Sequence, residues 1–314
     1  MLRNRMSRSS PNAANRARRL EWPTMLLAVV IHAGWIAATW WHGQIPAWLL
    51  PLVGGWLIAW HGSLQHETIH GHPTGIRAID AAIGSVPLAL WLPYAIYRRS
   101  HLAHHDAAIV TDPFEDPESR YLADVRGWHG RMLRAIEGVQ ASLAGRLLLG
   151  PPLTIGRSLA GEIGRGSRAP AATLRDWLPH LAGVAVVMAW LHVCGFGVGH
   201  YLIAFVYPGT ALSLLRSFAE HRAHADPAAR VAVVEHAGPF ALLFLNNNLH
   251  AAHHRAPALA WYRLPAFYRR HRARLLAANG DLRYRGYGAV ARLYLFRAHD
   301  ALVHPAYRGD TARS

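Results

Sequence analysis

The chain has 314 residues, of which 52% are hydrophobic and 16% are charged, a balance too apolar for a typical soluble protein of this length. All 33 basic residues are arginines, and a formal net charge of +15 is also typical of proteins that bind nucleic acid. The arginines lie outside the long apolar stretches, where a membrane protein places its positive charge, so we expect no nucleic-acid partner. The single cysteine, Cys194, excludes an internal disulfide and a cysteine-based metal site.

The order of polar and apolar segments predicts an all-α integral membrane protein. Residues 1–22 form a polar, arginine-rich tail that we expect to be disordered, and residues 23–314 form one domain. A helix needs about 20 apolar residues to cross a bilayer. Four stretches approach this length and predict two transmembrane hairpins: 24–41, 46–60, 178–197 and 199–215. The positive-inside rule then places both termini, and a histidine-rich cap, on the cytoplasmic side of an inner or cytoplasmic membrane.

Two further apolar runs are too short to span a bilayer. Residues 81–97 follow Asp80, and residues 231–245 contain Glu235. Because each run carries a carboxylate near its edge, we expect both to form interfacial helices or re-entrant segments.

The chemistry of the chain is concentrated in clusters of histidine. Residues three or four apart lie on the same face of a helix. A helical HETIH, HLAHH or HAAHH therefore presents its imidazoles together. A chance origin is improbable because the five-residue pattern of the second cluster recurs in the third. With one histidine from SFAEHRAH, the candidate metal ligands are His66, His70, His101, His104, His105, His221, His250, His253 and His254.

The number of these histidines indicates two metal ions. Imidazole suits Fe, Cu, Ni and Zn better than Mg or Ca. An octahedral ion accepts about six ligands, so nine imidazoles predict two ions with four or five nitrogens each and open positions for a small molecule. The neighbouring His61, His72 and His224 are alternatives to individual ligands of this set.

Other metal proteins share parts of this pattern. HETIH matches the His-Glu-x-x-His signature of zinc peptidases, in which Glu67 would act as the base, but a peptidase leaves HLAHH and HAAHH without a role. Ferritin-like proteins need two Glu-x-x-His motifs, and only Glu67 to His70 fits. A transporter predicts ionisable residues within its spans, which are nearly absent here. An intramembrane zinc peptidase and a non-catalytic metal-binding protein remain as remote alternatives.

In its three histidine motifs and two predicted hairpins, the chain resembles the integral-membrane fatty-acid desaturase and hydroxylase superfamily over about residues 24–260. The resemblance implies a non-haem di-iron centre whose ligands are the nine histidines above, with His221 in the position of an extra ligand after the last hairpin. Several relatives carry an asparagine four residues before that histidine, where this chain has Ser217. The candidates to replace this asparagine are Asn246, Asn247 and Asn248.

The segment HHDAAIVTDPFEDPES, which begins at His104, is also similar to the region after the second histidine motif of membrane alkane hydroxylases. Its carboxylates Asp112, Asp116 and Glu118 either orient metal-bound imidazoles or form a solvated acidic loop. Together with Glu67, the residues Asp112 and Asp116 are our candidate catalytic carboxylates.

The resemblance implies an enzyme that uses dioxygen and two electrons to oxidise a lipid acyl chain. Fatty-acid desaturation is the preferred reaction, and hydroxylation of an alkane, a fatty acid or a carotenoid is the alternative. The sequence has no Gly-x-Gly-x-x-Gly nucleotide motif, so the electrons must come from another protein such as a ferredoxin, a rubredoxin or a b-type cytochrome. A short basic run has two possible roles: it would dock such an acidic partner, or it would anchor the chain to the membrane surface. It consists of Arg263, Arg269, Arg270, Arg272 and Arg274.

Overall fold

The computed structural model describes residues 20–123 and 127–307, so most of the predicted basic tail lies outside the described residues. The N-terminal half contains α1 (Trp22–Trp40), η2 (His42–Gln44), α2 (Leu50–Ile69), α3 (Arg77–Gly84), α4 (Tyr94–Asp106), α5 (Gly127–Val139), α6 (Leu143–Leu148) and α7 (Gly150–Arg168). The C-terminal half contains α8 (Pro170–Val193), α9 (Val198–Tyr201), η3 (Leu202–Val206), α10 (Tyr207–Glu220), η4 (Pro227–Arg230), β1 (Val233–Val234), α11 (Pro239–Leu243), α12 (His250–Arg255), η5 (Trp261–Arg263), α13 (Leu264–Ala278), β2 (Arg283–Tyr284), α14 (Tyr287–Tyr294) and η6 (Pro305–Tyr307).

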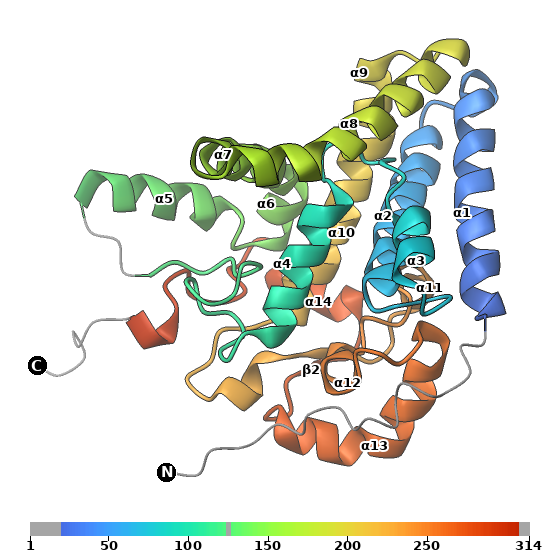
Figure 1. Ribbon diagram of the computed structural model, residues 1–314. Coiled ribbons are helices and arrows are strands. Elements are labelled where there is room, and N and C mark those ends of the chain that lie inside the picture. Colours follow the sequence, from blue (N-terminus) through green and yellow to red (C-terminus); the bar gives the residue numbers. More distant parts are fainter. Residues whose placement is uncertain (1–19, 124–126, 308–314) are drawn as a thin grey trace, which may run out of the picture.

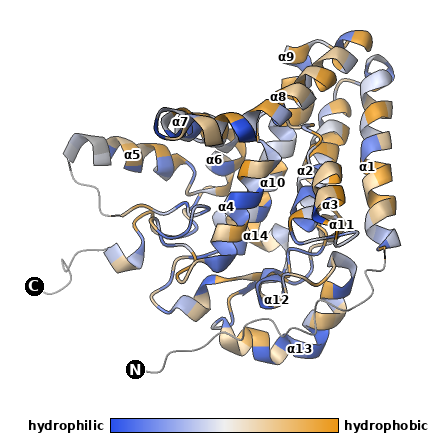
Figure 2. Cartoon of the chain, in the orientation of Figure 1, coloured by the Kyte–Doolittle hydropathy of each residue, from blue (hydrophilic) through white to orange (hydrophobic). Residues whose placement is uncertain are grey.

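Three helices of the described chain are long and apolar enough to cross a membrane: α1, α8 and the continuous helix of α9, η3 and α10 over Val198–Glu220. The predicted all-α integral membrane fold is therefore confirmed. The span predicted at residues 46–60 overlaps the first half of α2, which is not among these three because its second half is polar. Figure 2 shows the hydrophobic residues gathered in α1, α8 and α9, whereas α4 and α12 are largely hydrophilic.

Glycines allow α2 and the helix that ends in α10 to pack closely. A Cβ atom on Gly54 would lie 2.6 Å from the carbonyl oxygen of Ala204, and one on Gly55 would lie 2.8 Å from Pro208. Small residues permit this close approach of two helices, which run in the same direction here. The histidines at the end of α2 are thereby brought close to His221, which follows α10.

The apolar run at residues 81–97 is neither a re-entrant helix nor a single interfacial helix. It is divided among the end of α3, an irregular segment at residues 85–93 and the first turn of α4. The hydroxyl of Tyr201 donates to the carbonyl oxygen of Leu88 at 2.6 Å. Nε2 of His180 lies 2.9 Å from the carbonyl oxygen of Leu90. These contacts fix the segment against the membrane helices, so the start of α4 is fixed as well.

The second short run, residues 231–245, forms β1 and α11 rather than one membrane-associated helix. Strand β1 pairs in parallel with β2, and the amide of Val234 donates to the carbonyl oxygen of Asn248 at 2.8 Å. This connection holds the start of α12 beneath α2 and α4 (Figure 1). Figure 1 also shows α5 and α7 lying across the direction of α1.

Candidate metal centre

Four segments that are distant in sequence bring all nine predicted histidines together. They come from the end of α2, from α4, from the residue after α10 and from α12. The potential ligand atoms lie within 4.8 Å of one another in each of two groups, His66, His70, His101, His105 and His253 in the first, and His104, His221, His250 and His254 in the second.

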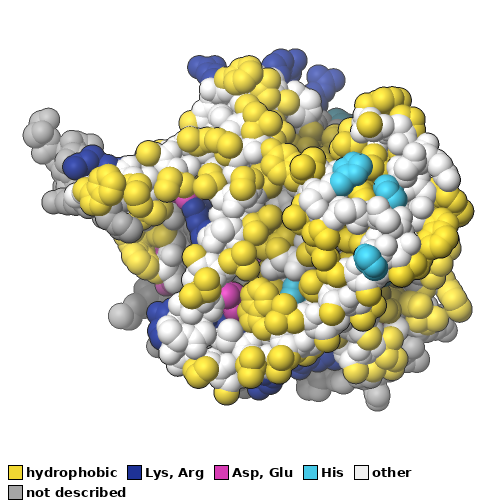
Figure 3. All heavy atoms as spheres, turned by 90° about the horizontal axis from the view of Figure 1, so that it is seen from above, with side chains coloured by type: hydrophobic (Ala, Val, Ile, Leu, Met, Phe, Trp, Pro, Cys, Tyr) yellow, Lys and Arg dark blue, Asp and Glu magenta, His cyan; other side chains and the backbone are white. Residues whose placement is uncertain are grey.

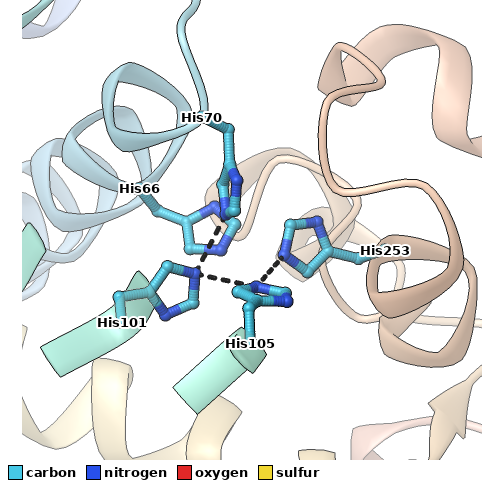
Figure 4. Close-up of side chains that lie close together, drawn as sticks. All are labelled: His66, His70, His101, His105 and His253. Atoms are coloured by element: carbon cyan, nitrogen blue, oxygen red, sulfur yellow. Dashed lines mark hydrogen bonds between the residues drawn. The ribbon is translucent and has the colours of Figure 1, made fainter. Parts of the chain in front are cut away.

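The first group presents converging ring nitrogens (Figure 4). Nε2 of His101 lies 3.0 Å from that of His70 and 3.1 Å from that of His105, which is itself 3.0 Å from Nε2 of His253. Metal–nitrogen bonds of about 2.1 Å at right angles place two nitrogens roughly 3 Å apart. These separations therefore suit several ligands of one ion.

The second group has the same geometry. Nε2 of His250 lies 2.9 Å from that of His221 and 3.1 Å from that of His254. Nε2 of His104 lies 3.3 Å from that of His254 and completes the group. This group has one histidine fewer than the first.

Histidines that are adjacent in sequence belong to different groups. His104 and His105 are consecutive in α4, and His253 and His254 are consecutive in α12. Because successive residues of a helix point about 100° apart, each short helix serves both groups at once. The rings of His105 and His254 are only 4.5 Å apart, so the two groups adjoin.

Burial keeps most of these imidazoles in the neutral form that binds metal. Burial, reinforced by the charge of neighbouring imidazoles, lowers the pKa of His70 to about 2 and that of His105 to about 3. The pKa of His104 is raised, because burial is outweighed by its hydrogen bond to Asp116 and by nearby carboxylates. Neutral imidazoles have the free lone pairs that metal ligation requires.

Carboxylates and an amide hold the other ring nitrogens of several histidines. Nδ1 of His104 lies 2.8 Å from Oδ1 of Asp116, and Nδ1 of His101 lies 3.3 Å from Oε1 of Glu118. Nδ1 of His250 lies 3.0 Å from Oδ1 of Asn247 and 3.3 Å from Oε1 of Glu220. Such partners fix the orientation and tautomer of metal-bound histidines.

The other candidate carboxylates have different surroundings. Glu67 accepts a hydrogen bond from the amide of Trp261 at 3.1 Å, and burial raises its pKa to about 7. Asp112 accepts hydrogen bonds from the amide of Phe114 and from the hydroxyl of Tyr307, at 2.8 and 2.7 Å. Within the described residues, the hydrogen bonds of the Asp112 carboxylate join it to this turn and to Tyr307, and to no imidazole of either group.

The alternative histidine ligands lie outside both groups. His61 packs edge-on against His32. His72 lies 3.0 Å from a carboxylate oxygen of Glu21, and His224 accepts a hydrogen bond from the amide of Asp226.

Of the residues considered for the missing asparagine, Asn247 lies closest to the histidines. Its Nδ2 is 3.5 Å from Nε2 of His66, so one side chain contacts both groups. Asn246 and Asn248 donate to the carbonyl oxygens of Trp261 and Val234 instead. Ser217 donates to the carbonyl oxygen of Leu214 at 3.3 Å. Glu220, which contacts His250, was not among the predicted site residues. Its position directly before the predicted ligand His221 could have indicated it.

A cavity of about 210 Å³ lies between α2, α4 and α10. Its wall is mostly apolar, with Ile58, Leu92, Leu214 and Phe244 among the lining residues, and Tyr97 and Arg216 add polar groups. The Tyr97 ring lies 5.9 Å from that of His101, so the cavity adjoins the first histidine group.

Together, the membrane helices and the two histidine groups define an integral membrane protein whose buried imidazoles are suited to bind metal. The profile of the family described as fatty acid desaturase matches residues 45–287, which is more than three quarters of the chain. The chain therefore belongs to the fatty acid desaturase family, and the predicted resemblance is confirmed at that level. No curated protein matches the chain.

Proposed function

We propose that the chain is a di-iron oxidoreductase that uses dioxygen to desaturate a lipid acyl chain. The observation that carries the proposal is the division of nine buried or half-buried histidines into two adjoining groups of ligand atoms. Membership of the fatty acid desaturase family supports an oxidoreductase acting on lipid.

The residues present fit two metal ions. The first group offers five imidazoles and the second offers four, with Asp116, Glu118 and Asn247 orienting ligand rings from behind. An all-nitrogen donor set suits a transition metal rather than Mg or Ca, and the family favours iron. When bound, two irons supply the redox chemistry by which dioxygen is reduced and hydrogen is removed from an unactivated C–H bond.

The chain itself positions the substrate. The apolar wall of the inner cavity suits a hydrocarbon segment and excludes water, while Tyr97 marks the end beside His101. Removal of a second hydrogen gives an alkene, whereas transfer of oxygen gives an alcohol, and the placement of the chain against the centre decides between them. We propose desaturation first, with hydroxylation of an alkane, a fatty acid or a carotenoid as the alternative.

Electrons reach this centre from a separate acidic carrier, and α13 is the proposed docking face. Arg269, Arg270 and Arg274 are exposed on this helix, whereas Arg272 is paired with Glu235 at 2.6 Å. We propose that this face and both termini lie on the cytoplasmic side. Replacing the three exposed arginines by glutamine should lower the rate and flatten its dependence on salt, because steering of an acidic partner would be lost. An unchanged rate and salt dependence would exclude docking at α13.

The intramembrane zinc peptidase remains the weaker candidate, because it would use only the first histidine motif, one further ligand and Glu67. The deciding experiment supplies the reconstituted protein with lipids, dioxygen and a reductase system, and analyses the lipids by mass spectrometry. Loss of two hydrogen atoms would identify a desaturase and gain of one oxygen a hydroxylase. Cleavage of a membrane peptide without lipid oxidation would contradict both.

A further inference from the structure

A groove outside the metal centre joins α3, α4 and α8. Its polar end encloses about 720 Å³ and is lined by Arg77 of α3, Arg98 and Arg99 of α4 and Arg175 of α8. A second hollow of about 410 Å³ shares Tyr94, Ala95, Arg175 and Asp176 with the first. The two hollows therefore form one groove, which we call the α4–α8 groove.

The polar end of the α4–α8 groove carries excess positive charge. Asp176 is already paired with Arg99 and Arg165, each at 2.7 Å. Arg77, Arg98 and Arg175 make no ion pair with any residue that the structure describes, and Asp106 is the remaining acidic residue lining this end. Three guanidinium groups from three helices can donate to the oxygens of one phosphate group.

The other end of the groove is apolar and follows a membrane helix. Its lining includes Val86, Pro87, Pro179, Val186 and Val187. Helix α8 is also the least buried of the candidate spans. Of its most apolar stretch of 18 residues, 17% are buried, against 39% and 44% in the other two spans. Figure 3 shows one end of the molecule, where hydrophobic side chains predominate and most visible arginines lie toward the margin. In a membrane, the outer surface of α8 must therefore be covered by lipid.

We propose that the α4–α8 groove binds one anionic phospholipid. The phosphate group lies among Arg77, Arg98 and Arg175, and an acyl chain lies against Val186 on α8. A soluble phosphate compound would satisfy the arginines but leave the apolar end uncovered, so charge and hydrophobicity together favour a membrane lipid. The inference does not depend on the reaction at the metal centre.

The lipid would also support the metal centre mechanically. Helix α4 carries Arg98 and, within the next two turns, the ligands His101, His104 and His105. Arg77 and Arg175 belong to the two helices beside it. A phosphate shared by these arginines ties the metal-bearing helix to α3 and α8, so bound phospholipid should slow the loss of metal to a chelator.

Native mass spectrometry of the full chain in mild detergent tests the proposal by counting bound lipids. Phosphatidylglycerol should bind as a single tight adduct, and phosphatidylcholine should bind more weakly. The triple variant Arg77→Gln, Arg98→Gln and Arg175→Gln should bind phosphatidylglycerol at least about tenfold more weakly, because each arginine contributes to anionic-lipid binding. The matched control replaces Arg131, Arg292 and Arg297, which are exposed elsewhere, and should bind the lipid normally.

Two further measurements separate the lipid from other ligands. Val186→Trp keeps every charge but fills the apolar end, where Val186 is 70% exposed, and should also weaken phosphatidylglycerol binding. Equal binding of the two lipids, or normal binding by the triple variant, would overturn the proposal. Displacement of phosphatidylglycerol by an equal concentration of glycerol 3-phosphate would overturn it too, because the site would then recognise a soluble anion.

Discussion

His104 and Asp116 are both buried, and Nδ1 of the imidazole lies 2.8 Å from Oδ1 of the carboxylate. The carboxylate is itself held by the amides of Thr111 and Glu118, at 2.8 and 2.9 Å. The loop after α4 is thus connected through one side chain to the second histidine group. Asp116 has the geometry of a residue that positions a metal ligand.

Replacement of Asp116 by asparagine should weaken metal binding about 10- to 100-fold, as is usual when the partner of a metal-bound histidine is lost. Asp112→Asn is the matched control, because Asp112 lies in the same loop but contacts Tyr307 and turn amides. Competition with a chelator measures both affinities. Equal losses in the two variants would indicate a general effect on the loop instead of a role for Asp116 in positioning His104.

The separation of neighbouring histidines into two groups predicts selective loss of metal. His105→Ala removes a ligand of the first group and His104→Ala one of the second, so each variant should keep roughly one of two ions. Elemental analysis of the purified variants tests this prediction. His271→Ala is the control, because His271 packs against Phe267 on α13, outside both groups, and should leave the metal content unchanged.

Glu67 distinguishes oxidation from peptide hydrolysis. The variant Glu67→Gln keeps a side chain of similar shape that can still accept the hydrogen bond from the amide of Trp261. We expect it to retain its metal and part of its rate of lipid oxidation, whereas a peptidase would lose its general base. Complete loss of lipid oxidation with full metal content would assign Glu67 an essential catalytic role and contradict this prediction.

The close packing of α2 predicts sensitivity to added volume. Gly54→Leu would force a side chain against Phe205 and the backbone of Ala204. Overpacking of this kind typically costs about 1–3 kcal/mol. Thermal unfolding in detergent should show the loss, whereas Gly43→Leu should unfold as the native protein does, because nothing lies within 4 Å of a Cβ atom on Gly43. Equal stability of the Gly54 variant would mean that the two helices can separate freely.

Acid should destabilise the metal-free protein. The unfolded chain takes up protons on histidine below a pH of about 6.5, whereas folding holds the pKa of His70 at about 2 and that of His105 at about 3. The unfolded state thus binds more protons as pH falls from 6.5, and each such histidine removes up to about 1.4 kcal/mol of stability per pH unit. Unfolding temperatures measured with chelator at pH 5, 6 and 7 should decline steadily toward pH 5. A flat profile would show that these imidazoles are not buried in the neutral form.

The histidines of the centre could be predicted from the sequence because their spacing matches the turn of a helix. HLAHH and HAAHH lie in α4 and α12, as the repeated spacing requires. The assignment of each histidine to one of the two groups could not be predicted from the sequence, because it depends on how α2, α4 and α12 are rotated against one another. Two further contacts depend on packing between distant segments in the same way: Glu220 contacts His250, and Asn247, which lies three residues before His250, contacts His66.

The membrane helices are predicted well where apolar residues are continuous, as in α1 and α8. Apolar runs alone do not reveal where a segment bends. Residues 81–97 contain Pro87 and Pro93, and proline ends or distorts helices, so this run is divided instead of forming one element. The irregular segment that results is packed by Tyr201 and His180, whose positions no local pattern indicates.

Metal content is the most direct test of the central claim. Elemental analysis of the protein, purified in mild detergent without added metal and without a histidine tag, should find about two irons per chain, one for each histidine group. A single zinc ion per chain, with no iron, would contradict the di-iron centre and direct the next assay toward peptide cleavage within the membrane.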